Sequence, residues 1–112
     1  MAGFKDFREI VAWQLAHELK VRIDTFVCRP EFQRKFKFSD QLTDAARSGP
    51  RNIAEGFARF RHKEFAHFVR IAKGSEAEVL NHIIDAHDQR LITQDELLST
   101  EHEGVRNFVC EA

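Results

Sequence analysis

Apolar residues recur at steps of three and four along most of the chain, which is the period of an α-helix and not of a strand. The first such stripe covers about residues 7–28, and Asp6 and Glu9 have the spacing of a capping box at its start. Arg29-Pro30 is expected to end this helix, because a residue that precedes proline avoids helical torsion angles. The stripe consists of Ile10, Ala12, Trp13, Leu15, Ala16, Leu19, Ile23 and Phe26.

A second stripe follows a segment, residues 31–38, that is rich in Phe, Lys and Arg and is expected to be a loop. Ser39 and Asp40 are both good N-caps, so the helix is predicted to begin there and to end between Gly56 and Arg61. Pro50 lies inside the stripe, where it removes a backbone donor, and predicts a kink. The apolar and small residues of this stripe are Leu42, Ala45, Ala46, Gly49, Ile53 and Phe57.

A third helix is predicted over about residues 62–87, with Ala72, Val79, Ile83 and Ala86 aligned on one face. Gly74 interrupts it, and an interior glycine suggests a close approach of another helix. Thr93 to Glu96 reads as a capping box that starts a fourth helix. Four amphipathic helices with short links predict an all-α fold over residues 1–112: a single domain that is an antiparallel up-down-up-down four-helix bundle, with helix two kinked near Pro50.

Charge is divided unevenly along these 112 residues, although the formal net charge is only -1. Residues 29–75 carry 11 basic and 5 acidic residues, whereas residues 76–112 carry 2 basic and 9 acidic residues. Such a division allows one surface to attract polyanions and another to attract basic partners, including copies of the same chain. Two ordinary solvated faces would produce the same pattern.

The N-terminal residues offer no signal-peptide core, and no membrane span is expected anywhere in the chain. With only two cysteines, a reduced cytoplasmic setting is the expectation. Cys28 ends the first helix and Cys110 the fourth, so antiparallel packing places them near opposite ends of the bundle. We therefore expect no internal disulfide.

Basic residues concentrate on the second helix, the following turn and the third helix, where they could form a surface that follows a phosphate backbone. Phe32, Phe36, Phe38 and Phe60 lie among them or close by in the sequence. Exposed, these rings could stack on bases; burial is preferred, because exposed Phe clusters promote aggregation. The candidate nucleic-acid-binding residues are Arg47, Arg51, Arg59, Arg61, Lys63, Arg70 and Lys73, with Arg34, Lys35 and Lys37 as possible additions.

A polar stripe runs beside the apolar one on the second helix, where Ser48, Asn52 and Glu55 fall at steps of four and three. Ser75 and Glu78 lie on the matching part of the third helix. Backbone groups freed by Pro50 need partners, and these side chains can supply them. The five residues are predicted to form a buried hydrogen-bond network that fixes the register of the bundle; a ligand site is the alternative.

An enzyme with two metal ions was considered, because four-helix bundles can carry paired Glu-x-x-His motifs. Glu64 and His67 have this spacing, but the motif occurs once, and Glu78 and His82 are four residues apart. Phe65 and Phe68 are expected in the core, and this placement turns Glu64 and His67 outward. No catalytic residue, metal or cofactor is therefore expected; the di-metal carboxylate enzyme is a remote alternative, with Glu18 and Glu55 as its further ligands.

Several segments resemble a known family. Residues 50–56 read P-R-N-I-A-E-G, which is similar to the P-x-N-I-A-E-G signature of the four-helix bundle proteins encoded in intervening sequences of bacterial 23S ribosomal RNA genes. Residues 11–16, 39–46, 63–65 and 74–78 also resemble that family's patterns. The resemblance covers nearly the whole chain.

The resemblance implies a non-enzymatic protein. Related bundles are accessory proteins of diversity-generating retroelements, which form pentameric rings and contact nucleic acid and a reverse transcriptase through a basic surface. The resemblance implies a similar homo-oligomer here, such as a pentamer, but not the retroelement role, because that role depends on neighbouring genes. From the basic surface we expect an accessory protein that binds RNA, DNA or a ribonucleoprotein partner, with a reverse transcriptase or another basic protein as candidate partners. The alternative is a protein–protein interaction scaffold that binds no nucleic acid.

Overall fold

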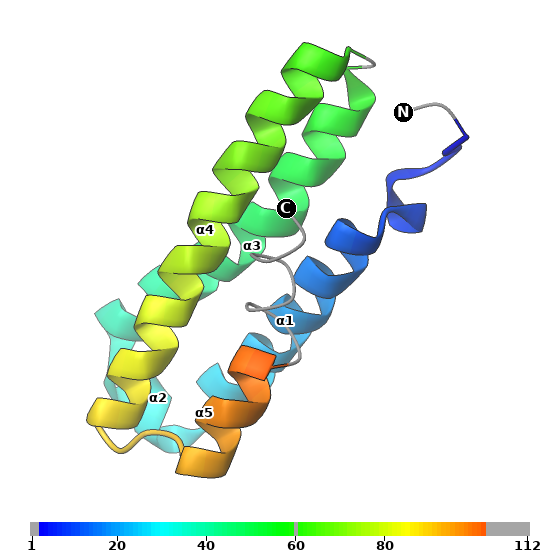
Figure 1. The fold of residues 1–112 in the computed structure, drawn as a ribbon. Coiled ribbons are helices and arrows are strands. Elements are labelled where there is room, and N and C mark those ends of the chain that lie inside the picture. The colour runs from blue at the N-terminus through cyan, green and yellow to red at the C-terminus, as the bar shows by residue number, and fades with distance from the viewer. Residues whose placement is uncertain (1–2, 60, 103–112) are drawn as a thin grey trace.

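The computed structural model describes residues 3–59 and 61–102, and every regular element among them is helical. Figure 1 shows α1, α3 and α4 as long rods with alternating chain direction, and α5 as a short helix at one end. The chain forms an elongated body of 44 × 24 × 19 Å. The elements are η1 Phe7–Glu9, α1 Val11–Val27, α2 Pro30–Arg34, α3 Phe36–Ala58, α4 His62–Asp88 and α5 Gln94–Thr100.

Helix α3 is the central element, because it packs against α1 on one side and, more extensively, against α4 on the other. The predicted all-α helical bundle is confirmed. The fourth helix is described only as α5, Gln94–Thr100, and the rest of the predicted helix lies outside the described residues. Cys110 also lies outside them, so the absence of a disulfide stays a prediction; Cys28 is an exposed free thiol.

The first predicted helix is divided in two. The capping box of Asp6 and Glu9 is present, but it closes only the single 3-10 turn η1. Ile10 then takes an extended conformation (φ -77°, ψ 123°), and α1 begins at Val11. Ile10 is buried, so the break turns its side chain into the core. At the other end Arg29 is extended before Pro30, as expected.

The prediction of a loop over residues 31–38 is wrong. Pro30 occupies the first turn of the short helix α2, where its missing N–H costs nothing, and Phe32 anchors this helix in the core with none of its surface exposed. The chain turns at Lys35, and α3 begins at Phe36, three residues before the expected cap. Ser39 is not an N-cap; its Oγ donates a hydrogen bond to the carbonyl of Phe32 at 2.7 Å.

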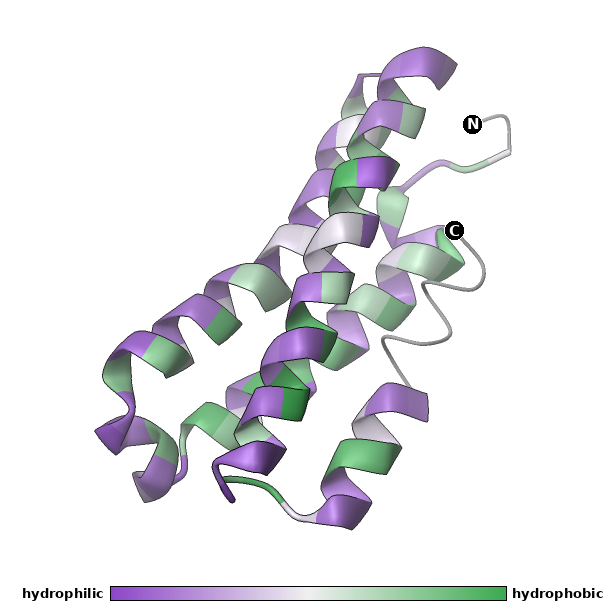
Figure 2. Ribbon diagram, turned by 60° about the vertical axis from the view of Figure 1, so that its left-hand side comes forward, coloured by the Kyte–Doolittle hydropathy of each residue, from purple (hydrophilic) through white to green (hydrophobic). Residues whose placement is uncertain are grey.

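Helix α3 continues without a break through Pro50. Its axis changes direction near mid-length, where the pale colours of small residues lie (Figure 2). Proline explains the bend, because its ring displaces the carbonyl of the residue four positions earlier, Ala46, and gives that carbonyl no N–H in return.

A helix cap and an ion pair stabilise the end of the bundle at which α5 lies. Thr93 and Glu96 form the predicted capping box at the start of α5. Glu96 also accepts a bidentate pair from Arg29, with Nη1 at 3.1 Å from Oε1 and Nη2 on Oε2. This pair joins α5 to the start of α2, and it lowers the pKa of Glu96 to about 2.

The apolar core falls into two clusters along the rod. The larger one joins α1, α2, α3, α4 and α5 and contains Phe32, Leu42 and Ile83; the smaller one contains Ile10, Ala16, Ile53, Phe57 and Ala72. The two clusters are separated along the rod by residues 47–52 of α3 and residues 73–78 of α4. The residues at this level make up the polar region described below.

Candidate functional site

The seven candidate nucleic-acid-binding residues are all exposed. They lie on the second half of α3, the turn and the first half of α4, and we call this segment, residues 47–73, the basic hairpin. Its acidic residues are Glu55 and Glu64. The segment therefore carries an excess of five positive charges on a chain whose formal net charge is -1.

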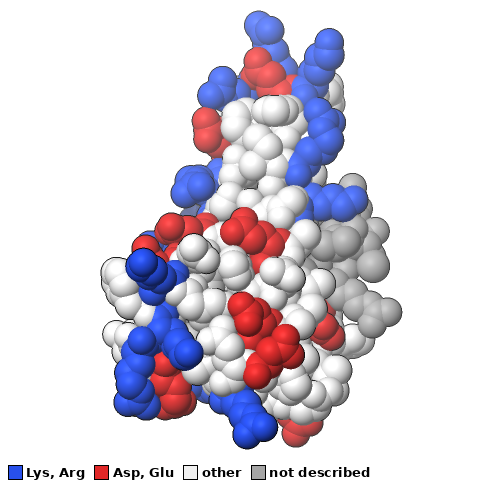
Figure 3. Space-filling model, turned by 90° about the vertical axis from the view of Figure 1, so that its left-hand side faces the viewer, with Lys and Arg blue, Asp and Glu red and all other residues white. Residues whose placement is uncertain are grey.

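Helical geometry distributes these charges over two flanks of the hairpin. Arg47 and Arg51 are four residues apart in α3 and point away from the buried face of that helix. Lys63 and Arg70 are seven residues apart in α4 and point away from α3. Figure 3 shows Lys and Arg along both edges of the protruding end, with uncharged atoms between them. The basic residues thus surround the hairpin and do not form one flat patch.

Arg59 differs from the other basic residues of the hairpin. Its Nη2 donates to Glu55 Oε1 at 3.1 Å, and its guanidinium carbon lies 5.1 Å from the centre of the Phe68 ring. Both side chains of the ion pair are about half exposed, at 49% and 48%. Glu55 therefore offsets part of the charge of Arg59, and the remaining six residues carry most of the positive potential.

Three residues of the predicted polar network come together between α3 and α4. Asn52 Nδ2 donates to the backbone carbonyl of Ser48 at 2.8 Å and to its Oγ at 3.0 Å. The hydroxyl of Ser75 in α4 lies 2.7 Å from Ser48 Oγ. This side-chain contact links the two helices at the level of Pro50.

The other two residues of the predicted network lie elsewhere. Glu55 is occupied by Arg59, as described above. Glu78 is exposed and faces His82 one turn later in α4, with 3.4 Å between Oε2 and Nε2. Neither side chain is hydrogen-bonded to the Ser48 hydroxyl, so the cluster that joins the helices is smaller than expected.

Glu76 is the polar residue that the sequence did not single out. Its side chain is completely buried, and neither carboxylate oxygen has a hydrogen-bond partner among the described residues. Burial alone raises the pKa of Glu76 to about 8. A carboxyl group in this position is mainly neutral at pH 7.

Gly49 makes room for this carboxyl group. A Cβ atom at position 49 would stand 1.9 Å from Glu76 Oε1, which is far inside van der Waals contact. The sequence contained a signal for this arrangement: Glu76 falls on the apolar stripe of α4, four residues after Ala72 and three before Val79. A carboxylate on a core stripe opposite a small residue indicates a buried acid.

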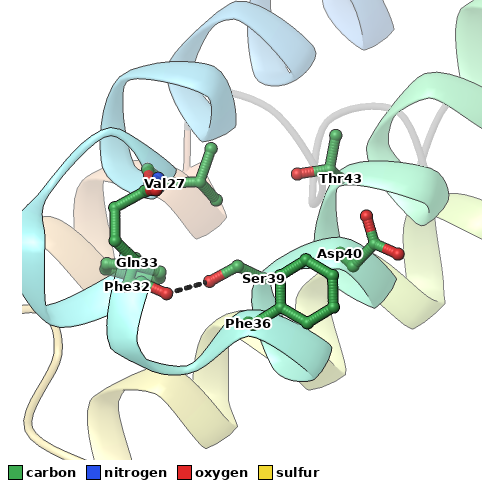
Figure 4. Close-up of a pocket in the computed structure, with 7 residues that line it drawn as sticks. All are labelled: Val27, Phe32, Gln33, Phe36, Ser39, Asp40 and Thr43. Atoms are coloured by element: carbon green, nitrogen blue, oxygen red, sulfur yellow. Dashed lines mark hydrogen bonds between the residues drawn. The ribbon is translucent and has the colours of Figure 1, made fainter.

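The Phe-rich segment divides by burial. Phe32 is buried and Phe38 is half-buried, whereas Phe36 is 73% exposed; Phe60 lies outside the described residues. Figure 4 shows Phe36 and Asp40 at an open hollow of about 210 Å³ that Ser39 and Thr43 also line. Ligand pockets usually have 300–1,000 Å³, so this hollow is small for an organic cofactor.

Glu64 and His67, the residues considered for a metal site, lie on α4 near the turn, and His67 is exposed. Within residues 3–59 and 61–102, no group of three or more His, Cys, Asp or Glu side chains is arranged to hold a metal ion. In the same part of the chain, no helix combines the length and the apolar character that a bilayer span requires.

Comparison with known proteins adds the family. No curated protein matches the chain. No solved structure matches it either. A family model described as 23S rRNA-intervening sequence protein matches residues 8–106, which include all the described helices from α1 to α5. The chain therefore belongs to the family of 23S rRNA-intervening sequence proteins.

Proposed function

We propose that this protein is a non-enzymatic, self-associating accessory protein of the bacterial cytoplasm that binds RNA or DNA, alone or in a ribonucleoprotein, through the basic hairpin. The observation that carries the proposal is the excess of five positive charges over residues 47–73, with all seven basic side chains exposed. Contacts with phosphates supply most of the affinity in such complexes and need no base-specific pocket.

The distribution of the charges supports a flexible or single-stranded nucleic acid as the target. Arg47 and Arg51 lie on one flank of the hairpin and Lys63 and Arg70 on the other, so a strand must bend around the hairpin to contact both. A stiff duplex would contact one flank at a time, because double-stranded DNA resists bending over such short lengths.

The test measures binding of fluorescently labelled oligonucleotides, single-stranded and duplex, by anisotropy over a range of salt concentrations. The affected variant replaces Arg51, Lys63 and Arg70 by Gln, since these exposed side chains form no ion pair with another described residue. The matched control replaces Arg34, Lys35 and Lys37 by Gln, which removes the same charge at the opposite end of α3. All six residues are exposed, so both variants should fold.

We expect the hairpin variant to lose affinity at low salt and to show a salt slope smaller by about 0.7 for each single-strand phosphate contact that it loses. The control should retain most of the affinity. Equal loss in the two variants would contradict the hairpin as the binding surface, and absence of binding at low salt would refute the function.

Self-association is proposed on separate grounds. Large apolar side chains are exposed on α1, α3, α4 and α5, and a second copy of the chain that covers some of them would remove apolar surface from water. Analytical ultracentrifugation should give a mass that is a multiple of 13.0 kDa, with a pentamer as the form that the family resemblance implies. A monomer at micromolar concentration would contradict this part. Apart from Phe4, the large apolar side chains exposed among the described residues are Val11, Val21, Phe36, Ile71, Ile84 and Leu98.

An interaction scaffold is the second candidate, and the division of charge favours it. The excess of basic residues up to Ser75 is followed by 9 acidic and 2 basic residues. Glu76 is buried, but Glu78, Asp85, Asp88 and Asp95 are exposed, so one chain could present a basic surface to the acidic surface of a partner or of a second copy. In that case the hairpin variant should change the oligomer mass and leave nucleic-acid retention unaffected. A basic protein such as a reverse transcriptase would bind the acidic surface.

A further inference from the structure

Glu76 lies at the boundary between the two apolar clusters. Its neighbours along the α4 stripe, Ala72 and Val79, belong to different clusters and are both completely buried. From α3 it meets Gly49, and α1 presents Ala16 beside the same glycine. Among the described residues no charged side chain contributes to the raised pKa of Glu76, for which burial is the cause.

A backbone carbonyl without its usual helical donor lies on the facing turn of α3. In an α-helix the carbonyl of residue i accepts from the N–H of residue i+4. Pro50 has no N–H, so the carbonyl of Ala46 lacks its helical donor. Ala46 is itself buried, and its carbonyl therefore also has no ready access to water. Gly49 belongs to the same turn, and its missing side chain admits Glu76 Oε1 to that turn.

We propose that Glu76 is held as the neutral acid and donates its proton in a hydrogen bond to the carbonyl of Ala46, which makes a proton-dependent lock between α4 and α3. One buried acceptor without a donor and one buried acid without an acceptor then satisfy each other. Sequence chemistry explains all three parts: Pro50 frees the carbonyl, Gly49 provides the space, and Glu76 supplies the proton.

Ionisation would release this lock. The carboxylate has no proton to donate, and it would face a carbonyl oxygen in an apolar interior where none of the described residues offers a cation. Either water must enter between α3 and α4 or the helices must move apart at this level. The two apolar clusters on either side would then no longer be joined through a continuous dry interior. The lock does not depend on whether the basic hairpin binds nucleic acid.

The first test compares wild type with Glu76→Gln by urea unfolding between pH 5 and pH 8. The amide has the same size, keeps a donor for the carbonyl and cannot ionise. A group with a raised pKa makes the folded state bind more protons than the unfolded state, so its contribution to stability is full below the unfolded pKa and falls as pH rises towards the folded pKa. Wild type should lose up to tenfold in the folding equilibrium constant for each pH unit, relative to the Gln variant.

Glu18→Gln is the control, because it makes the same replacement at a glutamate that is exposed on α1. This variant should follow the pH dependence of wild type. If Glu76→Gln also follows wild type, Glu76 is ionised in the folded protein and the lock is refuted.

The second test identifies the acceptor. Carbon-13 NMR of labelled glutamate side chains gives the titration midpoint of Glu76, whose signal is the one lost in Glu76→Gln. We expect this midpoint well above that of every other glutamate. Pro50→Ala restores the N–H that normally donates to the Ala46 carbonyl. This N–H then competes with the Glu76 carboxyl group for that carbonyl, so the titration midpoint of Glu76 should fall. An unchanged midpoint would refute Ala46 as the acceptor, and an ordinary midpoint in wild type would refute the neutral acid.

Discussion

The carboxyl group of Glu76 in α4 lies over the backbone of Gly49 in α3, so close that a methyl group on Gly49 would stand 1.9 Å from Oε1. The contact is between a side chain and the facing helix, and not between neighbours in the sequence. It depends on two choices of residue, a glycine in one helix and an acid in the other, and each can be changed separately.

Gly49→Ala should destabilise the protein by about 1–3 kcal/mol, because the new methyl group must displace a buried side chain in a packed interior. Urea unfolding at pH 6 measures the change. Glu76→Ala in the same chain removes the atom that the methyl group meets, so the double variant should lose less than the sum of the two single variants. Strict additivity would show that the contact is unimportant.

Gly74→Ala should have the opposite effect. Gly74 lies in the interior of α4, is exposed, and an added Cβ would meet nothing within 4 Å. Alanine should therefore stabilise the helix by about 0.5–1 kcal/mol through its higher helix propensity. A thermal unfolding midpoint below that of wild type would show a contact at position 74 that is absent from the single chain.

Ser48→Ala tests the polar link between α3 and α4. The hydroxyl of Ser48 lies 3.0 Å from Asn52 Nδ2 and 2.7 Å from Ser75 Oγ, and its loss leaves both groups with fewer partners. We expect a loss of about 1 kcal/mol, typical of one hydrogen bond in a half-buried site. A loss near zero for Ser48→Ala would mean that water replaces the hydroxyl.

Glu96→Gln tests the ion pair with Arg29 at low pH. The pair lowers the pKa of Glu96 to about 2, so its stabilisation is present above the unfolded pKa of about 4.5 and is lost as pH falls to 2. Glutamine keeps the capping box, and the variant should be less stable by about 1–2 kcal/mol at pH 6, after allowance for solvent screening. The difference should disappear at pH 2; a constant difference would contradict the ion pair as its cause.

Local signals in the sequence predicted local structure well. The capping box of Thr93 and Glu96 depends on four consecutive residues, and it starts α5 where expected. The extended Arg29 before Pro30 follows from a steric rule between two residues. The predicted bounds of the long helix α4, residues 62–87, are close to the observed His62–Asp88, because its apolar stripe is long and regular.

Features that depend on contacts between distant residues were missed. Helix α2 forms around Phe32, whose burial depends on α1, α3 and the core, and five residues give too little periodicity to reveal it. Gly74 was expected to mark a close helix approach, but it faces open space. The close approaches are at Gly49 and at Gly56, where an added Cβ would lie 2.8 Å from Phe68 Cβ. A glycine in a pattern shows that a side chain is absent, and only the fold shows what stands opposite.

The candidate site was predicted in part. Ser48 and Asn52 share a polar stripe on α3, and Ser75 lies on the matching part of α4, so helical spacing alone predicted their place at the α3–α4 boundary. Charged residues are rarely buried without a partner, so the charge of Glu76 indicates an exposed side chain although its position on the apolar stripe indicates a buried one. The structure shows that the position is the better guide here. The exposure of the seven basic residues followed from their positions opposite the apolar stripes.

The division of the core also determines how the molecule opens. The smaller cluster holds the part of α3 and α4 that carries the basic hairpin, and far fewer apolar side chains stabilise it than the larger cluster at the α5 end. Amide hydrogens of residues 55–59 and 61–66 should therefore exchange with solvent through local fluctuations, while those of the larger cluster exchange only through global unfolding. A partner that binds the basic hairpin would thus be able to change its conformation while the larger cluster stays folded.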